Sequence, residues 1–267
     1  MQILSAKYSE QPIGMSNHYH DCHQILYIVS GKVIAKIGEK EYCAEDGSVL
    51  ILSRFEEHSI RLISSEYKRY TLRISADIFR GSEENALLFS VLVNRAKGFS
   101  HLLQAQEFAP LLKSLFEQMT QEYAQKAPLH EKMLTLCLNQ ILITLYRINP
   151  ALFLSQNHRG NAMVKEIQSR LEEQYGHPIT LNDLANDYHI SPSHLSHLFK
   201  KITGYSIMEY LQVCRLSAAK KALSSSDQSI KEIVSKCGFG DESNFSRMFK
   251  ERTGMTPTSF RKKYQIH

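Results

Sequence analysis

The sequence of 267 residues has no tryptophan and no stretch of about eighteen uncharged apolar residues that would cross a membrane. Its five cysteines include no Cys-x-x-Cys pair, which argues against a disulfide framework and against a zinc finger. The first residues, Met1-Gln-Ile-Leu-Ser, show no signal-peptide pattern. We therefore expect a soluble, cytoplasmic protein with reduced thiols and no membrane partner.

Composition and charge set weak limits on function. A hydrophobic content of 43% at this length is typical of a globular protein with about two domains. Residues 161–267 contain 15 Lys and Arg and 11 Asp and Glu, so they carry +4 of the total net charge of +5. This surplus favours nucleic-acid binding only weakly.

The strongest pattern is a helical repeat in the last third of the chain. Its two copies are offset by 49 residues at Leu184 and Ile233, but by 50 at Phe199 and Phe249, so one residue is inserted where a turn is expected. Each copy has two stretches of apolar residues at spacings of three and four, separated by a break. The repeat therefore predicts two helix-turn-helix units.

Helix ends are marked by capping residues. Ser191 before Pro192 is typical of a helix start, and Asp241 can cap the matching helix of the second copy. Capping boxes are predicted for Ser206 with Glu209 and for Ser229 with Glu232. Gly204 and Gly254 are suited to left-handed helix ends.

A helix-turn-helix lays its second helix in the major groove of DNA, so this helix needs one packing face and one face for bases. The residues expected to pack inward are Leu195, Leu198, Phe199 and Ile202 in the first copy, and Phe245, Met248 and Phe249 in the second. The candidate DNA-binding residues on the opposite faces are Ser193, His194, Ser196, His197, Lys200, Lys201, Glu242, Ser243, Asn244, Arg247 and Lys250. Arg247 is the best candidate base reader because a guanidinium pairs bidentately with guanine, whereas the lysines suit phosphate.

The segment from Ile207 to Leu223 is expected to be one helix about 25 Å long. Successive major-groove openings on one face of DNA are about 34 Å apart, so a helix of this length would place both second helices in adjacent grooves. Its expected packing residues are Tyr210, Leu211, Cys214, Leu216 and Ala218. For one half alone, an ordinary helical core is the favoured explanation of the pattern, but a core has no need to repeat around a fixed spacer.

The repeat resembles the DNA-binding domain of AraC/XylS-type transcription regulators. The matching residues are Ile190-Ser-Pro-Ser-His-Leu-Ser-His-Leu-Phe-Lys, Tyr210-Leu, Arg215-Leu216, Gly238-Phe239, Asn244-Phe-Ser-Arg-Met-Phe-Lys and Gly254-Met-Thr-Pro. The resemblance implies double-stranded promoter DNA and RNA polymerase as partners, and activation rather than repression.

The first 75 residues read as short strands and turns. Candidate strands are 25–29, 32–37, 48–52 and 66–74, with turns at Ser30-Gly31, Gly38-Glu39 and Asp46-Gly47. Together with His18-Tyr-His20 and His58, this pattern resembles the cupin-like sensory domain found in many regulators of the same family.

Several histidines make this segment a candidate binding site. A His-x-His pair on a strand points two imidazoles to one face, and a barrel brings a distant histidine alongside. Gln24 stands where metal-binding cupins carry an acidic ligand, and an amide is a poor metal donor. We therefore predict an effector pocket formed by His18, His20, Gln24, His58 and an inward Arg73, with no metal, no cofactor and no catalytic residue. A metal site that also involves His23 and purely structural histidines are the alternatives.

Helical patterns follow Asp77, at 83–95, 108–123 and 129–146. The second is expected to bury Leu111, Leu112, Leu115, Phe116, Met119 and Tyr123 on one stripe. The third is apolar almost all round, which leaves both intrachain packing and a subunit interface open. The family resemblance favours a homodimer, with Leu138 and Leu142 in its interface.

We predict an α+β multidomain chain. It comprises a cupin-like β-barrel sensory domain at 1–78, a helical dimerisation segment at 79–150, a linker at 151–162, and an all-α double helix-turn-helix domain at 163–267 that opens with a helix from Met163 to Tyr175. The predicted function is a sequence-specific transcription activator controlled by a small-molecule effector, a sugar or a small acid. The alternatives are a metal-dependent cupin enzyme and a constitutive regulator whose first domain only dimerises.

Overall fold

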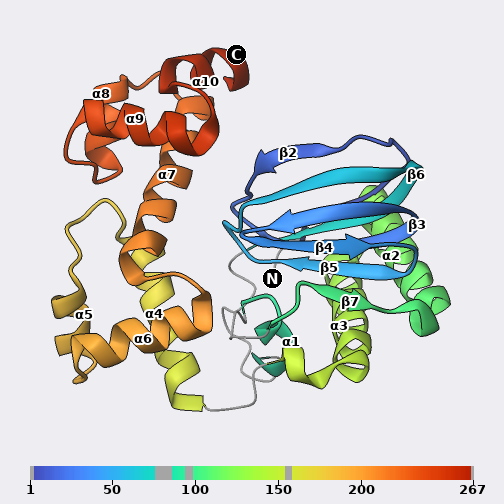
Figure 1. The fold of residues 1–267 in the computed structure, drawn as a ribbon. Coiled ribbons are helices and arrows are strands. Elements are labelled where there is room, and N and C mark those ends of the chain that lie inside the picture. The colour runs from blue at the N-terminus through green and yellow to red at the C-terminus, as the bar shows by residue number, and fades with distance from the viewer. Residues whose placement is uncertain (1–2, 76–85, 94–98, 154–157, 266–267) are drawn as a thin grey trace. The chain divides into compact units, whose positions relative to one another are not determined.

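The computed structural model describes residues 3–75, 86–93, 99–153 and 158–265 (Figure 1). The chain forms two compact units, Met1–Gln156 and Asn157–His267. The first combines an antiparallel sheet with helices, and the regular elements in the described residues of the second are all helices. In the described residues, no helix has the length and apolar character needed to cross a membrane.

The first unit is built on a seven-stranded antiparallel sheet. Its main path is β1-β6-β3-β5-β7, with β2 paired to β6 and β4 to β3. The strands are β1 Ile3–Ser9, β2 Met15–His18, β3 His23–Ile37, β4 Lys40–Ala44, β5 Ser48–Leu52, β6 His58–Ile74 and β7 Leu102–Gln104.

Two strands are longer than the sequence predicted. The strand end expected at Ser30-Gly31 is wrong because β3 continues to Ile37, and β6 begins at His58 rather than Glu66. The pairing of β3 with β6 shifts register on both sides of Gly31, so irregularities bend this ribbon where the turn was expected. Gly31 has φ +107°, and a Cβ there would lie 2.1 Å from the carbonyl oxygen of Glu66.

Gly31→Ala is expected to lower the free energy of unfolding by about 3 kcal/mol or more, because backbone strain and a backbone clash add together. Gly38 is a matched control, since it has φ +55° but a Cβ added there would meet no atom within 4 Å. Gly38→Ala should therefore cost only about 1 to 2 kcal/mol from the left-handed conformation. Urea denaturation of both variants measures the difference, and equal losses would show that the clash at Gly31 is relieved.

The alternation of side chains along β3 separates two cores. Ile25 and Tyr27 belong to a cluster that includes the buried residues of α2 and α3, whereas Leu26 and Ile28 belong to a second cluster with Tyr67. Helices α2 and α3 pack against each other beside the sheet (Figure 1). The second cluster fills the face that the helices do not cover.

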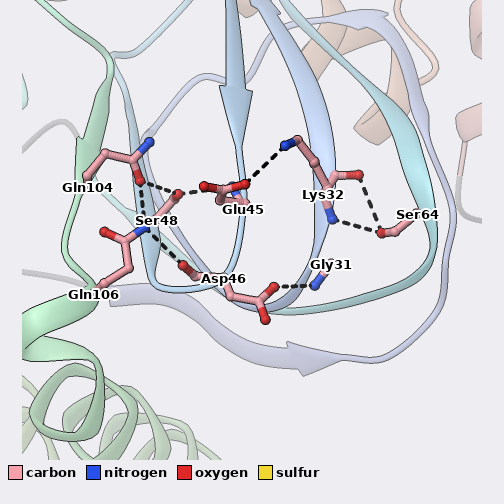
Figure 2. Close-up of polar contacts among 8 residues, drawn as sticks. All are labelled: Gly31, Lys32, Glu45, Asp46, Ser48, Ser64, Gln104 and Gln106. Atoms are coloured by element: carbon pink, nitrogen blue, oxygen red, sulfur yellow. Dashed lines mark hydrogen bonds and ion pairs between the residues drawn. The ribbon is translucent and has the colours of Figure 1, made fainter.

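Polar contacts cross-link neighbouring strands near the Asp46-Gly47 turn (Figure 2). The backbone N–H of Gly31 donates to Asp46 Oδ1 at 2.7 Å, and Ser48 Oγ donates to Gln104 Oε1 at 3.0 Å. Gln24 pairs with the opposite end of β5, at Leu52. The network therefore ties the bend of β3 at Gly31 to the start of β5 and the end of β7, away from the histidines described below.

The helices of this unit are α1 Ala86–Ser90, α2 Ala109–Gln125 and α3 His130–Ile148, with 3-10 turns η2 Gln106–Phe108 and η3 Pro150–Leu152. The predictions at 108–123 and 129–146 are confirmed, and that at 83–95 lies partly outside the described residues. On α2, Leu112, Leu115, Phe116 and Met119 are buried as predicted, but Leu111 is 48% exposed.

The apolar residues of α3 divide between two faces. Leu138 and Leu142 are fully buried in the core of their own unit, so their predicted place in a subunit interface is wrong. A different set is exposed on the same helix or just before it, namely Leu129 at 71%, Met133 at 38%, Leu136 at 57% and Ile143 at 36%.

The second unit contains α4 His158–Glu173, α5 Leu181–Asp187, α6 Pro192–Thr203, α7 Ile207–Ser225, α8 Ile230–Lys236, α9 Glu242–Thr253 and α10 Pro257–Tyr264. Helix α4 begins five residues before the predicted Met163. The linker expected at 151–162 is therefore shorter than predicted, since Leu152 and Phe153 are buried at one side and α4 begins at the other. Residues 154–157 lie outside the described part.

Candidate DNA interface and histidine cluster

Local capping sets the helix boundaries of the second unit. Each predicted cap accepts a hydrogen bond from the backbone N–H three residues later, and both predicted capping boxes are present. Gly204 and Gly254 end their helices with φ +80° and +74°. The helix-turn-helix prediction is confirmed at the level of helix starts and ends.

The inserted residue of the second copy is Gly240. In both copies a residue with positive φ follows the first helix, His189 in one and Gly238 in the other, and these two are 49 residues apart. The next helix is capped by Ser191 in the first copy and by Asp241 in the second, which are 50 apart. Ile190 and Phe239 are matched, because each donates its backbone N–H to the carbonyl oxygen five residues earlier, that of Ala185 or Val234. Gly240 is therefore the extra residue, and it falls in the turn as expected.

Helices α6 and α9 have the same order of buried and exposed residues over 192–201 and 242–251, and differ only at their last two residues, where Ile202 is buried and Arg252 is exposed. Leu195 and Phe199 are buried in α6, and Phe245 and Phe249 are buried in α9. Leu198 and Met248 were expected inside but are only half-buried. Of the predicted DNA-binding residues, Ser196 is half-buried and the other ten are exposed.

Two predicted base readers contact each other on α9. Arg247 Nη2 donates to Asn244 Oδ1 at 3.0 Å, and both side chains are exposed. They lie three residues apart, which places them on the same side of the helix. The contact restrains the guanidinium, so less conformational entropy is lost when it meets a base.

Helix α7 joins the two copies and is about 28 Å long at 1.5 Å per residue. It contacts α6 of the first copy and the preceding helix α4, and it contacts α8 of the second copy and the following helix α10. Tyr210, Leu211, Cys214 and Leu216 are buried as predicted, whereas Ala219 is buried in place of Ala218. Contacts with both copies explain why its buried residues do not form a single stripe.

Arg215 is a positioning residue whose role the sequence did not show. Its Nε donates to the carbonyl oxygen of Tyr175 at 2.8 Å, and its Nη2 donates to that of His177 at 3.1 Å. A Cβ at Gly238 would lie 2.8 Å from the same Tyr175 oxygen and 3.0 Å from Arg215 Nε. The guanidinium therefore joins the loop after α4 to the turn of the second copy.

In the first unit, three predicted histidines form a cluster. His18 at the end of β2 pairs with His58 at the start of β6, and His20 lies just after β2. Ligand atoms of the three imidazoles all lie within 4.8 Å of one another. The ring centroid of His58 is 4.3 Å from that of His18 and 5.4 Å from that of His20.

Burial keeps His58 neutral. Desolvation lowers the pKa of His58 to about 4, against the smaller opposing effect of its hydrogen bond to the Glu56 carbonyl oxygen. Its Nδ1 donates to that oxygen at 2.8 Å, because a carbonyl can only accept. Its Nε2 is buried and has no hydrogen-bond partner among the described residues.

Gln24 and Arg73 lie beside this cluster as predicted. They are directly opposite each other on β3 and β6, so both side chains leave the same face of the sheet. Arg73 Nη2 is 3.4 Å from His20 Nε2, and Gln24 Oε1 is buried without a hydrogen-bond partner in the described chain. His23 does not join the cluster, since its Nδ1 accepts from the backbone N–H of Arg54 at 3.3 Å.

Two family models match the chain. An AraC-like ligand-binding domain matches residues 6–136, and a helix-turn-helix domain matches residues 184–263. The chain is 25% identical over 248 residues to the transcriptional activator RhaS of Enterobacter, covering 91% of this chain and 86% of that protein. It is 36% identical over 106 residues to the HTH-type transcriptional regulator YijO of Escherichia coli, covering 40% of this chain and 38% of that protein.

Among solved structures, fatty-acid-bound ToxT of Vibrio cholerae has the same overall fold. The TM-score is 0.62 at 15% identity, and the match covers 96% of this chain and 93% of ToxT.

Proposed function

The chain belongs to the AraC family of transcription regulators, and on this basis we propose that it activates transcription from specific promoters in response to a small molecule. Its relatives are regulators, and some are named as activators. We propose that this chain likewise has no catalytic activity of its own and recruits RNA polymerase in the cytoplasm.

One observation carries the DNA-binding role, namely that α6 and α9 present the same exposed face from one connecting helix. A helix about 28 Å long is close to the spacing of about 34 Å between successive major-groove openings. We propose that α6 and α9 enter adjacent grooves. Arg247 and Asn244 then read bases, and Lys200 and Lys250 contact phosphates.

Arg247→Ala is expected to weaken binding to a selected site by about 1 to 3 kcal/mol and to relax preference at one base pair. Lys250→Ala should weaken binding to selected and random DNA alike, and should make the salt dependence less steep. Fluorescence anisotropy on both DNAs at two salt concentrations separates the two effects. Equal losses on both DNAs for Arg247→Ala would contradict its assignment as a base reader.

The effector is proposed to bind at the histidine cluster of the first unit. Small-ligand sites combine apolar walls with a few converging polar groups. Here the second core cluster supplies apolar residues, and His18, His20, Gln24, His58 and Arg73 supply polar ones. Such a site is suited to a sugar or a small acid.

The exposed apolar residues of α3 support a homodimer. Leu129, Met133, Leu136 and Ile143 recur at spacings of four, three and seven residues, so they form one stripe along the helix. A second copy of the same stripe is the partner that would cover it around a twofold axis.

A further inference from the structure

In place of the metal-free pocket expected from the sequence, we infer that His18, His20 and His58 hold one divalent transition-metal ion, such as Zn²⁺, Co²⁺, Ni²⁺ or Fe²⁺. The inference deepens the proposed sensor and rests on it, because the ion would form part of the effector site.

The three side chains are brought together by the sheet. The strand pairing of His18 with His58 fixes two of them, and their ligand atoms and one of His20 fall within 4.8 Å of one another. Three histidine ligands with further positions left for water or a ligand are a common arrangement around zinc and other first-row metals. An ion could be held there without a change of fold.

Hydrogen bonds to the backbone orient two of the imidazoles. His18 Nδ1 lies 2.7 Å from the carbonyl oxygen of Ser16, and His58 Nδ1 lies 2.8 Å from that of Glu56. Because a carbonyl only accepts, each Nδ1 carries the hydrogen and each Nε2 keeps its lone pair. Metal-binding histidines usually donate the N–H of their other ring nitrogen in this way, which fixes the orientation of the ring.

The buried Nε2 of His58 has no hydrogen-bond partner in the described residues. A buried acceptor without a partner costs free energy, and such atoms in folded proteins call for an explanation. A metal ion would satisfy this lone pair together with those of the two neighbouring imidazoles.

Arg73 adds a positive charge to the site and so affects which effector it can bind. Its Nη2 is 3.4 Å from His20 Nε2, so the guanidinium and an ion compete for that nitrogen and repel each other. Three neutral imidazoles leave the charge of a divalent ion uncompensated. An anionic effector, for example a small carboxylate, would balance both the ion and Arg73, which favours the small acid over the neutral sugar.

The test is a titration of metal-free, full-length protein with Co²⁺, followed by visible absorption and by calorimetry. We expect one ion per chain, with absorption bands typical of nitrogen-ligated Co²⁺. His58→Ala and His20→Gln should each weaken binding by about 100-fold or more, since even a residue supporting a ligand is worth about 10 to 100-fold. Replacing the exposed His177 by alanine should change nothing.

Arg73→Gln should change the affinity for Co²⁺ in the opposite direction to the histidine variants. Removing the positive charge should strengthen Co²⁺ binding by about tenfold, which a purely structural role of Arg73 would not produce. Circular dichroism of every variant shows whether it is folded. If His58→Ala does not fold, His20→Gln remains as the variant that tests the metal site. Co²⁺ binding that persists unchanged in the folded histidine variants would overturn the inference.

Anisotropy with promoter DNA on the same samples keeps the two proposals apart. Failure to bind metal with intact DNA binding would contradict only the metal site, whereas failure of the wild type to bind any DNA would contradict the proposed function. A small carboxylate that binds the metal-loaded protein more tightly than the metal-free protein would support the link between the ion and the effector.

Discussion

Full-length protein with Leu136→Glu is expected to sediment as a folded monomer, whereas Leu142→Glu is expected to unfold the first unit. Leu136 is 57% exposed on the stripe of α3, so a charge there meets water in the monomer and is desolvated only in a dimer. Leu142 is fully buried in the core shared with the sheet, so a carboxylate there should cost more than about 4 kcal/mol.

Sedimentation and thermal unfolding distinguish the two variants. Leu136→Glu should leave the unfolding temperature near that of the wild-type monomer and should lower affinity for a paired DNA site by about 100-fold or more through lost avidity. Affinity for a single site should be unchanged. A wild type that is monomeric at high concentration would refute the proposed dimer.

Helix α3 shows what the periodicity of apolar residues can predict and what it cannot. Because it is apolar almost all round, its sequence could not tell which leucines face the sheet and which face solvent. The core of the first unit decided this, by packing Leu138 and Leu142 against residues distant in sequence. Exposure in the folded chain was needed to find Leu136.

The same distinction between local and distant causes runs through the rest of the fold. Caps such as Ser191 and Asp241 act within three residues, so the helices of the second unit were predictable. The bend of β3 at Gly31 depends on pairing with β6, and the sequence suggested a turn instead.

The candidate sites show the same difference between features with local causes and features that depend on distant residues. His18, His20 and His58 were predicted together from spacing and family resemblance, and the structure gathers them. The hydrogen bonds that orient their rings involve backbone carbonyls, which no residue type reveals. The role of Arg215 was missed because its partners are backbone atoms about 40 positions earlier.

Replacing Arg215 by alanine should lower the free energy of unfolding of the second unit by about 2 to 3 kcal/mol, because it removes two charge-assisted hydrogen bonds to backbone carbonyls. Arg215→Lys should recover only part, since a lysine cannot supply both N–H groups in one plane. Lys221→Ala, at an exposed position on the same helix, is the control and should stay within about 0.5 kcal/mol of the wild type.

DNA binding should show what this contact does for function. If Arg215 fixes the second helix-turn-helix relative to the first, its loss weakens binding where both grooves are read and matters less where one half of the site is scrambled. Gly238→Ala pushes against the same Tyr175 carbonyl and against Arg215, so the two changes should be less than additive in a double-mutant cycle. Full additivity, together with equal losses on intact and half-scrambled DNA, would show that Arg215 only stabilises the fold. Coupling between the two changes would instead place the spacing of the two recognition helices under the control of one guanidinium at the middle of α7.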